Sequence, residues 1–262
     1  MNLAAELIYA INQWLVLALL FGLLLAVEEA GYRVGYRRSA QYDDDGRSNY
    51  GNLMAGLYGL MALFLAFTFA MAQQRFETRK ELVVTEANAI GTAWLRADLV
   101  AEPLRGEFRQ LLARYVDIRT PVKTFDPAGF RTAVAESESI HAEIWARAVA
   151  AAKAEPSPLT ALLVAATNDV IDTHGKRVAA ARNTVPGIVM MMVIAFALAT
   201  AAVTGYRCGI GARRYRLPSA AFLLLVAMVI GVIIDLDRPQ QGFITVDQSA
   251  MFDLRAGMRP AR

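Results

Sequence analysis

Charged residues are scarce in this chain, and Cys208 is its only cysteine. Asp, Glu, Lys and Arg make up 19% of the 262 residues. Soluble domains contain about 25%, so little polar side chain is left to cover a surface in water. A single cysteine excludes disulfides within the chain and metal clusters built from cysteines. The net charge of +3 comes from scattered basic residues, which gives no support for nucleic-acid binding.

The sequence also lacks the short motifs of the common enzyme classes. It contains no nucleophile elbow, Walker loop, paired-histidine zinc helix or paired-cysteine motif. Asp169, Asp172 and His174 would point in different directions on a helix, so they cannot hold a metal ion together. The three aspartates at 43–45 lack the alternating spacing of a calcium loop. We therefore expect no catalytic residues, no cofactor and no metal site.

Long stretches without charge are the main feature that is present. A helix needs about 20 apolar residues to cross the hydrocarbon layer, and a segment in lipid must satisfy its own backbone hydrogen bonds. The first stretch has neither the basic flank nor the cleavage site of a signal peptide, so we expect it to be retained. The uncharged stretches are 7–27, 48–74, 183–206 and 217–234. They predict transmembrane helices at 7–27, 52–73, 186–206 and 218–234.

The segment between the second and third of these helices predicts a helical domain outside the membrane. It is rich in Ala, Leu, Glu and Arg, which favour helices. Apolar residues recur along its first part in a stripe that requires a helical partner, at Phe76, Val83, Ala87, Ile90, Trp94 and Ala97. That part is expected to continue the second transmembrane helix without interruption.

The predicted fold is an all-α integral membrane protein with four transmembrane helices and a helical-bundle extramembrane domain inserted between helices two and three. A loop is expected at 28–50, and a short strand at 242–246, before a final helix. The predicted domain boundaries are 1–73 for the first two transmembrane helices, 74–185 for the helical domain, 186–236 for the last two transmembrane helices and 237–262 for a C-terminal tail.

The distribution of Lys and Arg predicts the orientation. No basic residue precedes the first transmembrane helix, whereas Arg33, Arg37 and Arg38 follow it, and four arginines lie between the third and fourth. The positive-inside rule places these loops in the cytoplasm and the large domain outside, in the periplasm of a bacterium. The opposite orientation is favoured by basic residues that flank the domain, namely Arg75, Arg79, Lys80, Lys176, Arg177 and Arg182.

The second transmembrane helix has two dissimilar faces. Small residues, which let helices approach closely in lipid, form one face: Ala55, Gly59, Ala62, Ala66 and Ala70. The opposite side carries Leu60, Phe64, Phe67, Met71 and Arg75. This bulky side would line a pore as an apolar constriction with Arg75 at its mouth. Alternatively, the bulky side faces lipid while the small face packs within the chain.

Two further sets of polar residues are candidate sites. The topology places five charged residues at helix ends on one side of the membrane, where they form either a functional site or a structural ion-pair network. These residues are Arg75, Arg182, Asp235, Asp237 and Arg238. On the helical domain, a polar layer that sets the register of the helices is expected from Glu86 and Asn88 with the opposing Asn168 and Asp172.

Several motifs resemble an uncharacterised bacterial membrane family known as bestrophin-like. They are LAFTF at 65–69, Arg75-Phe76, EANAIGTAWLRA at 86–97, NDVID at 168–172 and DLDRP at 235–239. Bestrophins proper are pentameric anion channels with the same layout of helices, a cytosolic helical domain and an aromatic, apolar neck on helix two. The acidic calcium clasp of animal bestrophins is missing here, so the resemblance does not imply calcium gating.

The resemblance implies a homo-oligomeric ion channel of the bacterial inner membrane that conducts inorganic anions, with helix two lining the pore. Its expected partners are the lipid bilayer and further copies of the chain, with a pentamer implied by the resemblance alone. The alternative is a non-conducting, membrane-anchored helical module that binds a partner or senses a signal. The cytosolic domain of bestrophins conflicts with the periplasmic position that the charge rule predicts.

Overall fold

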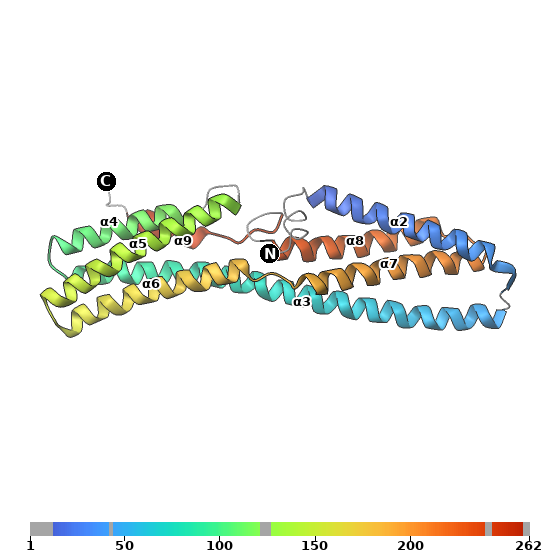
Figure 1. Ribbon diagram of the computed structural model, residues 1–262, viewed down its shortest axis with the longest axis horizontal. Helices are drawn as coiled ribbons and strands as arrows, with labels where there is room; N and C mark the ends of the chain where they lie inside the picture. Colours follow the sequence, from blue (N-terminus) through green and yellow to red (C-terminus); the bar gives the residue numbers. More distant parts are fainter. Residues whose placement is uncertain (1–12, 42–43, 121–126, 239–242, 259–262) are drawn as a thin grey trace. The chain divides into compact units, whose positions relative to one another are not determined.

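The computed structural model describes residues 13–41, 44–120, 127–238 and 243–258 (Figure 1). The elements are α2 (Gln13–Arg37), the 3-10 helix η1 (Ser39–Gln41), α3 (Asp44–Arg96), the 3-10 helix η2 (Ala97–Leu99), α4 (Leu104–Arg119), α5 (Pro127–Ala154), α6 (Pro158–Arg182), α7 (Gly187–Ile210), α8 (Arg216–Asp237) and α9 (Ser249–Gly257). The all-α class is confirmed.

The strand predicted before the last helix is wrong for its described residues. Residues 243–246 adopt no regular structure, and residue 242 lies outside the described residues. Val246 packs against the apolar core of the helical bundle, and its carbonyl accepts a hydrogen bond from the Gln248 side chain. No second strand pairs with this segment in the described part of the chain, and a strand requires such a partner.

The chain divides into two compact units. We call Met1–Gln74 with Thr184–Arg238 the membrane unit, and Arg75–Asn183 with Pro239–Arg262 the helical unit. The C-terminal tail is grouped with the helical bundle in this division, and the predicted domain boundaries stay a prediction. α3 contributes to both units, because it continues without a break from the second transmembrane segment into the bundle, as the sequence predicts.

The described residues contain four helical segments that are long and apolar enough to cross a membrane, which confirms the four predicted spans. Residues 7–12 of the first span lie outside the described residues. The apolar side chains of the four segments form a core between α2, α3, α7 and α8 that includes Leu24, Met61, Ala201 and Leu223. The loop predicted at 28–50 is wrong, since α2 continues to Arg37 and α3 begins at Asp44. The chain is thus a multi-pass membrane protein with longer helices than its uncharged stretches indicate.

Glycines explain why α2 stays helical beyond its uncharged stretch. Gly31 and Gly35 of α2 face Gly205 and Gly209 of α7, and the two backbones touch. A Cβ atom added at any of the four would lie closer than 3.0 Å to a backbone atom of the opposite helix. This contact needs small residues at four-residue spacing on both helices. The charged end of α2 is therefore packed against α7 as a helix.

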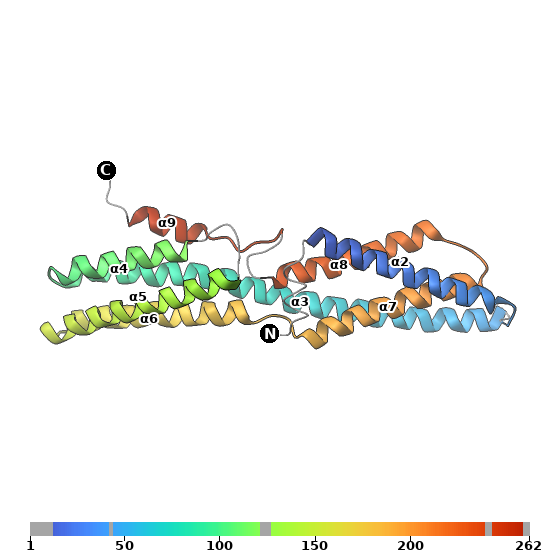
Figure 2. The ribbon, with the colours of Figure 1, turned by 45° about the horizontal axis from the view of Figure 1, so that its top comes forward.

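The helical unit is a bundle of α4, α5, α6 and the second part of α3, which lie side by side (Figures 1 and 2). The predicted stripe is confirmed along most of its length, because Val83, Ala87 and Ile90 lie in the buried core and Trp94 packs against it. Phe76, at its start, is half-buried. The α6 helix begins at a capping box in which the Ser157 side chain accepts a hydrogen bond from the Thr160 N–H.

Candidate functional site

The bulky face of α3 is largely open in the single chain. Leu60 is 42% exposed and Phe67 is 66% exposed. Phe64 is half-buried, and its ring stacks on Phe196 of α7 with the ring centres 4.7 Å apart. Met71 is half-buried as well. Of the predicted pore residues in the membrane unit, Leu60 and Phe67 are therefore the most open, and a role in lining a pore stays a prediction.

The small-residue face of α3 is open too, and its five members are all exposed. A Cβ atom added at Gly59 would meet nothing within 4 Å. The interpretation in which this face packs within the chain is therefore wrong. α3 uses a third face for that purpose, on which Met61, Thr68 and Ala72 are buried. Two open faces remain, one bulky and one small.

The predicted boundary charges are divided between the two units. Asp235, Asp237 and Arg238 are buried at the end of α8. The Asp237 carboxylate accepts a hydrogen bond from the Val185 N–H at 2.8 Å, which fixes the chain just before α7. Asp237 thus has a structural role within the membrane unit.

The other two members of this set, Arg75 and Arg182, belong to the helical unit. Arg75 donates a hydrogen bond to the Asn183 side chain at 2.6 Å, and Arg182 is exposed at the end of α6. Their pairing with the α8 carboxylates stays a prediction.

The predicted polar layer does not form as one group within the chain. Asn168 donates to the Asp172 carboxylate at 3.1 Å, and both side chains are exposed on α6. Asn88 is exposed on α3, whereas Glu86 is fully buried. Glu86 lies on the buried side of α3 together with Val83 and Ile90. It therefore takes different partners from the other three.

Glu86 is the centre of a buried polar cluster in the helical unit. Its Oε1 accepts a hydrogen bond from the Tyr115 hydroxyl, which also bonds to the His174 ring at Nδ1 over 3.1 Å. Its Oε2 accepts hydrogen bonds from Arg119 and Arg177. We call this cluster, with His141 added, the polar core: Glu86, Tyr115, Arg119, His141, His174 and Arg177.

Every helix of the bundle contributes to the polar core, and the C-terminal tail is attached to it. The His141 ring of α5 lies 4.6 Å from the Tyr115 ring and 4.8 Å from the His174 ring, measured between centres. Arg177 also donates to the Gln248 side chain at 3.1 Å, just before α9. The polar core therefore fixes the packing of four helices and the tail at one point.

The polar core pairs one carboxylate with two guanidinium groups in the interior of the bundle. Glu86 is 0% exposed, and the guanidinium groups of Arg119 and Arg177 offset its charge. Burial, and next the Glu86 carboxylate, raise the pKa of Tyr115 well above its usual 10, so its hydroxyl stays protonated and donates. The described residues contain no group of three or more His, Cys, Asp or Glu placed to hold a metal ion.

Sequence reasoning found Glu86 but missed its partners. Tyr115 and Arg119 are four residues apart, and His174 and Arg177 are three apart, so each pair shares one helix face. Polar pairs that interrupt an apolar face are the signal that was available. Both histidines of the chain belong to the polar core.

The histidine of α5 makes the stability of the helical unit depend on pH. Burial, and next the neighbouring His174, lower the pKa of His141 from 6.5 to about 4. The unfolded chain therefore binds this proton first as the pH falls below about 6.5, and the folded form loses stability until the pH reaches about 4. We expect His141→Asn to lose less stability than the wild type between pH 7 and pH 4.5, measured by denaturant unfolding with tryptophan fluorescence. Parallel losses in both proteins would contradict this assignment.

Residues 22–251 of the chain match the family of bestrophin-like domains. Crystal structures of a bacterial bestrophin homologue from Klebsiella pneumoniae share the fold. One, with a mutation, is 13% identical with a TM-score of 0.67, over 90% of this chain and 96% of that chain. Another, obtained by Zn-SAD phasing, is 12% identical with a TM-score of 0.63, over 90% and 96%. No curated protein sequence matches. Since the match covers most of its length, the chain belongs to the bestrophin-like family.

Proposed function

We propose that the protein is a homo-oligomeric ion channel that conducts inorganic anions through a pore lined by α3. The observation that carries the proposal is the presence of two open faces on this helix, with Phe67 on one and Gly59 on the other. At 100° per residue these faces are separated by about 130°. A helix in a ring of subunits needs two such faces, one toward the axis and one toward a neighbour.

The chemistry of each face supports this division of roles. Small residues are favoured where helices approach closely in lipid, so the face around Gly59 suits contact with a second copy of the chain. Large apolar residues in a narrow channel gate it by excluding water, so the face with Leu60 and Phe67 suits the constriction. Arg75, four residues beyond Met71, would attract anions toward the pore.

Family membership supports the remaining parts of the proposal. The resemblance to bestrophins supports a pentamer, a position in the bacterial inner membrane and an anion as the permeant ion. The resemblance does not support the proposed orientation, because bestrophins have a cytosolic helical domain whereas the charge rule places the helical unit in the periplasm. The periplasmic position therefore stays a prediction of the charge distribution.

The proposal is tested by widening the constriction at Phe67. Phe67→Ala removes a large apolar ring from every subunit, so the pore should wet more easily and anion flux should rise several-fold. The measurement is chloride efflux from liposomes that contain the purified protein. Phe67 is preferred to Phe64, because Phe64 also packs on Phe196.

Leu225→Ala is the matched control for this experiment. Leu225 is 62% exposed on α8, so its replacement also removes a large exposed apolar side chain from the membrane unit but leaves α3 intact, and flux should stay unchanged. Equal flux from the wild type and both variants, in folded and oligomeric protein, would contradict the assignment of the pore face. It would favour a membrane-anchored module that binds a partner.

A further inference from the structure

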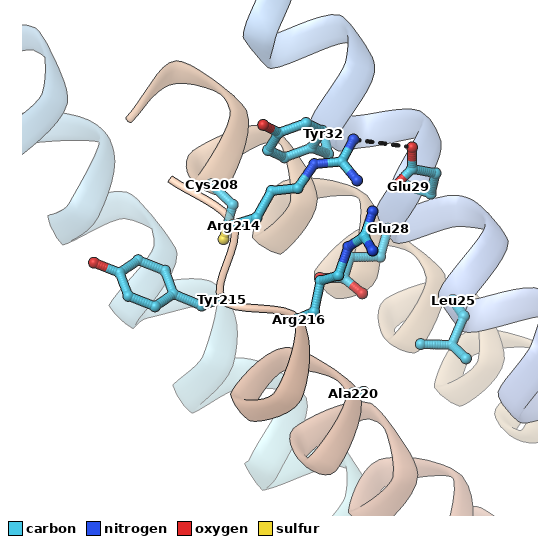
Figure 3. A pocket seen from close by; sticks show the side chains of 9 residues that line it. All are labelled: Leu25, Glu28, Glu29, Tyr32, Cys208, Arg214, Tyr215, Arg216 and Ala220. Atoms are coloured by element: carbon cyan, nitrogen blue, oxygen red, sulfur yellow. Dashed lines mark hydrogen bonds and ion pairs between the residues drawn. The ribbon is translucent and has the colours of Figure 1, made fainter. Parts of the chain in front are cut away.

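A pocket of about 240 Å³ lies in the membrane unit, where α2, α7 and α8 meet the loop before α8 (Figure 3). Its lining changes in character along its depth. Leu25 and Ala220 belong to uncharged stretches of the sequence, whereas Glu28 and Arg216 lie just beyond them. The pocket therefore crosses the level at which the apolar part of the membrane meets the lipid headgroups.

Part of the charge in this pocket is already paired. The Arg214 guanidinium lies over the Tyr32 ring, 4.1 Å from its centre, and reaches Glu29 at 3.4 Å (Figure 3). Glu29 also accepts a hydrogen bond from Arg33 at 2.9 Å. These contacts hold the loop before α8 against α2 and fix one wall of the pocket.

Two charged side chains in the lining remain for a ligand. Among the described residues, neither Glu28 nor Arg216 has a side-chain hydrogen bond or ion pair, and they do not pair with each other. Arg216 is also the first residue of α8, whose N-terminus has no side-chain cap and carries the positive end of the helix dipole. The pocket thus presents an anion site and a separate carboxylate.

We propose that this pocket binds the headgroup of a zwitterionic phospholipid with a primary amine, of the phosphatidylethanolamine type. Arg216 and the start of α8 receive the phosphate, and Glu28 receives the ammonium group. Leu25 and Ala220 contact the glycerol and the first acyl carbons. This assignment concerns the lipid contact of each subunit and does not depend on conduction.

The arrangement discriminates between headgroups. A glycerol headgroup has no cation for Glu28, so that carboxylate stays without a partner. A choline group carries a cation but no N–H donor, so it cannot form a charge-assisted hydrogen bond to Glu28. A primary ammonium group supplies both, and one hydrogen bond to a charged group corresponds to about tenfold in affinity.

Cys208 provides a reporter in the wild-type chain. It lines the pocket, is half-buried and is the only thiol of the protein. The experiment follows the rate of maleimide labelling of the full chain in detergent with added lipid. We expect phosphatidylethanolamine to slow labelling about tenfold more than phosphatidylcholine or phosphatidylglycerol at equal concentration. Equal protection by the three lipids would overturn the proposal.

Two variants test the contacts to the ammonium group and to the phosphate separately. Glu28→Gln should abolish the preference for the amine-bearing lipid, and Arg216→Gln should weaken protection by all phospholipids. Arg37→Gln, which removes an exposed charge of α2 outside the pocket lining, should behave as the wild type. An unchanged preference in Glu28→Gln would overturn the proposal. The comparison of lipids on the wild-type protein remains decisive if a variant fails to fold.

The same labelling experiment with a soluble compound distinguishes a lipid from a soluble ligand that carries the same charged groups. Glycerophosphoethanolamine carries the phosphate and the amine without acyl chains. It should protect Cys208 far less than the lipid, because it lacks the contacts with Leu25 and Ala220. Equal protection by this soluble compound would overturn the assignment of a lipid.

Discussion

Replacing Glu86 with Gln should destabilise the helical unit by about 3–5 kcal/mol, the range for breaking a buried ion pair from one side. The amide keeps the size of the side chain but removes its charge. Arg119 and Arg177 are then left in a buried site without their shared anion. Denaturant unfolding of the full chain in detergent, followed by the fluorescence of Trp94 and Trp145, measures the loss.

Glu81→Gln is the matched control for this substitution. Glu81 is exposed on the same helix, and its side chain makes no hydrogen bond or ion pair among the described residues. The same chemical change should therefore alter the unfolding free energy by less than about 0.5 kcal/mol. Similar losses in the two variants would contradict the role of the polar core.

A second large loss of stability is expected when one methyl group is added to the membrane unit. In Gly205→Ala the new Cβ atom would collide with the backbone of α2 at Glu28, and neither helix can yield locally. The helices must separate along their whole contact, so we expect a loss of about 1–3 kcal/mol or more. The yield and thermal stability of protein in detergent, measured by size-exclusion chromatography after heating, report it.

Gly22→Ala tests whether the effect belongs to the helix contact. Gly22 lies in α2, and a Cβ atom there would meet nothing within 4 Å. Alanine also favours helices more than glycine does, so this variant should be as stable as the wild type or slightly more stable. A Gly205→Ala protein that matches Gly22→Ala would show that α2 and α7 do not need their backbone contact.

The sequence predicts the elements of this fold better than their contacts. Missing charge marks the four spans, because lipid penalises charge wherever it occurs in a segment. The same rule predicts the end of α2 too early, because it assigns the charged residues Glu28 and Arg33 to a loop. The contact of Gly205 and Gly209 with the α2 backbone, which keeps this segment helical, is visible only in the structure. A pair of glycines four residues apart in both helices was the available signal.

The candidate sites show the same limit. The seven-residue stripe identifies the buried face of α3, which includes Val83 and Ile90. It does not show that Glu86 meets Tyr115 and Arg177, which are 29 and 91 residues away in the chain. Helical periodicity gives the direction of a side chain but not the residue that it meets. Partners between helices follow from tertiary packing alone.

We propose above that copies of the chain form an anion-selective pore around α3. The most direct test is the flux of chloride and of potassium through purified wild-type protein in liposomes, with empty liposomes as the baseline. We expect chloride flux above the baseline and little potassium flux, in a preparation that is oligomeric by size-exclusion chromatography. Baseline flux of both ions from folded, oligomeric protein would contradict it.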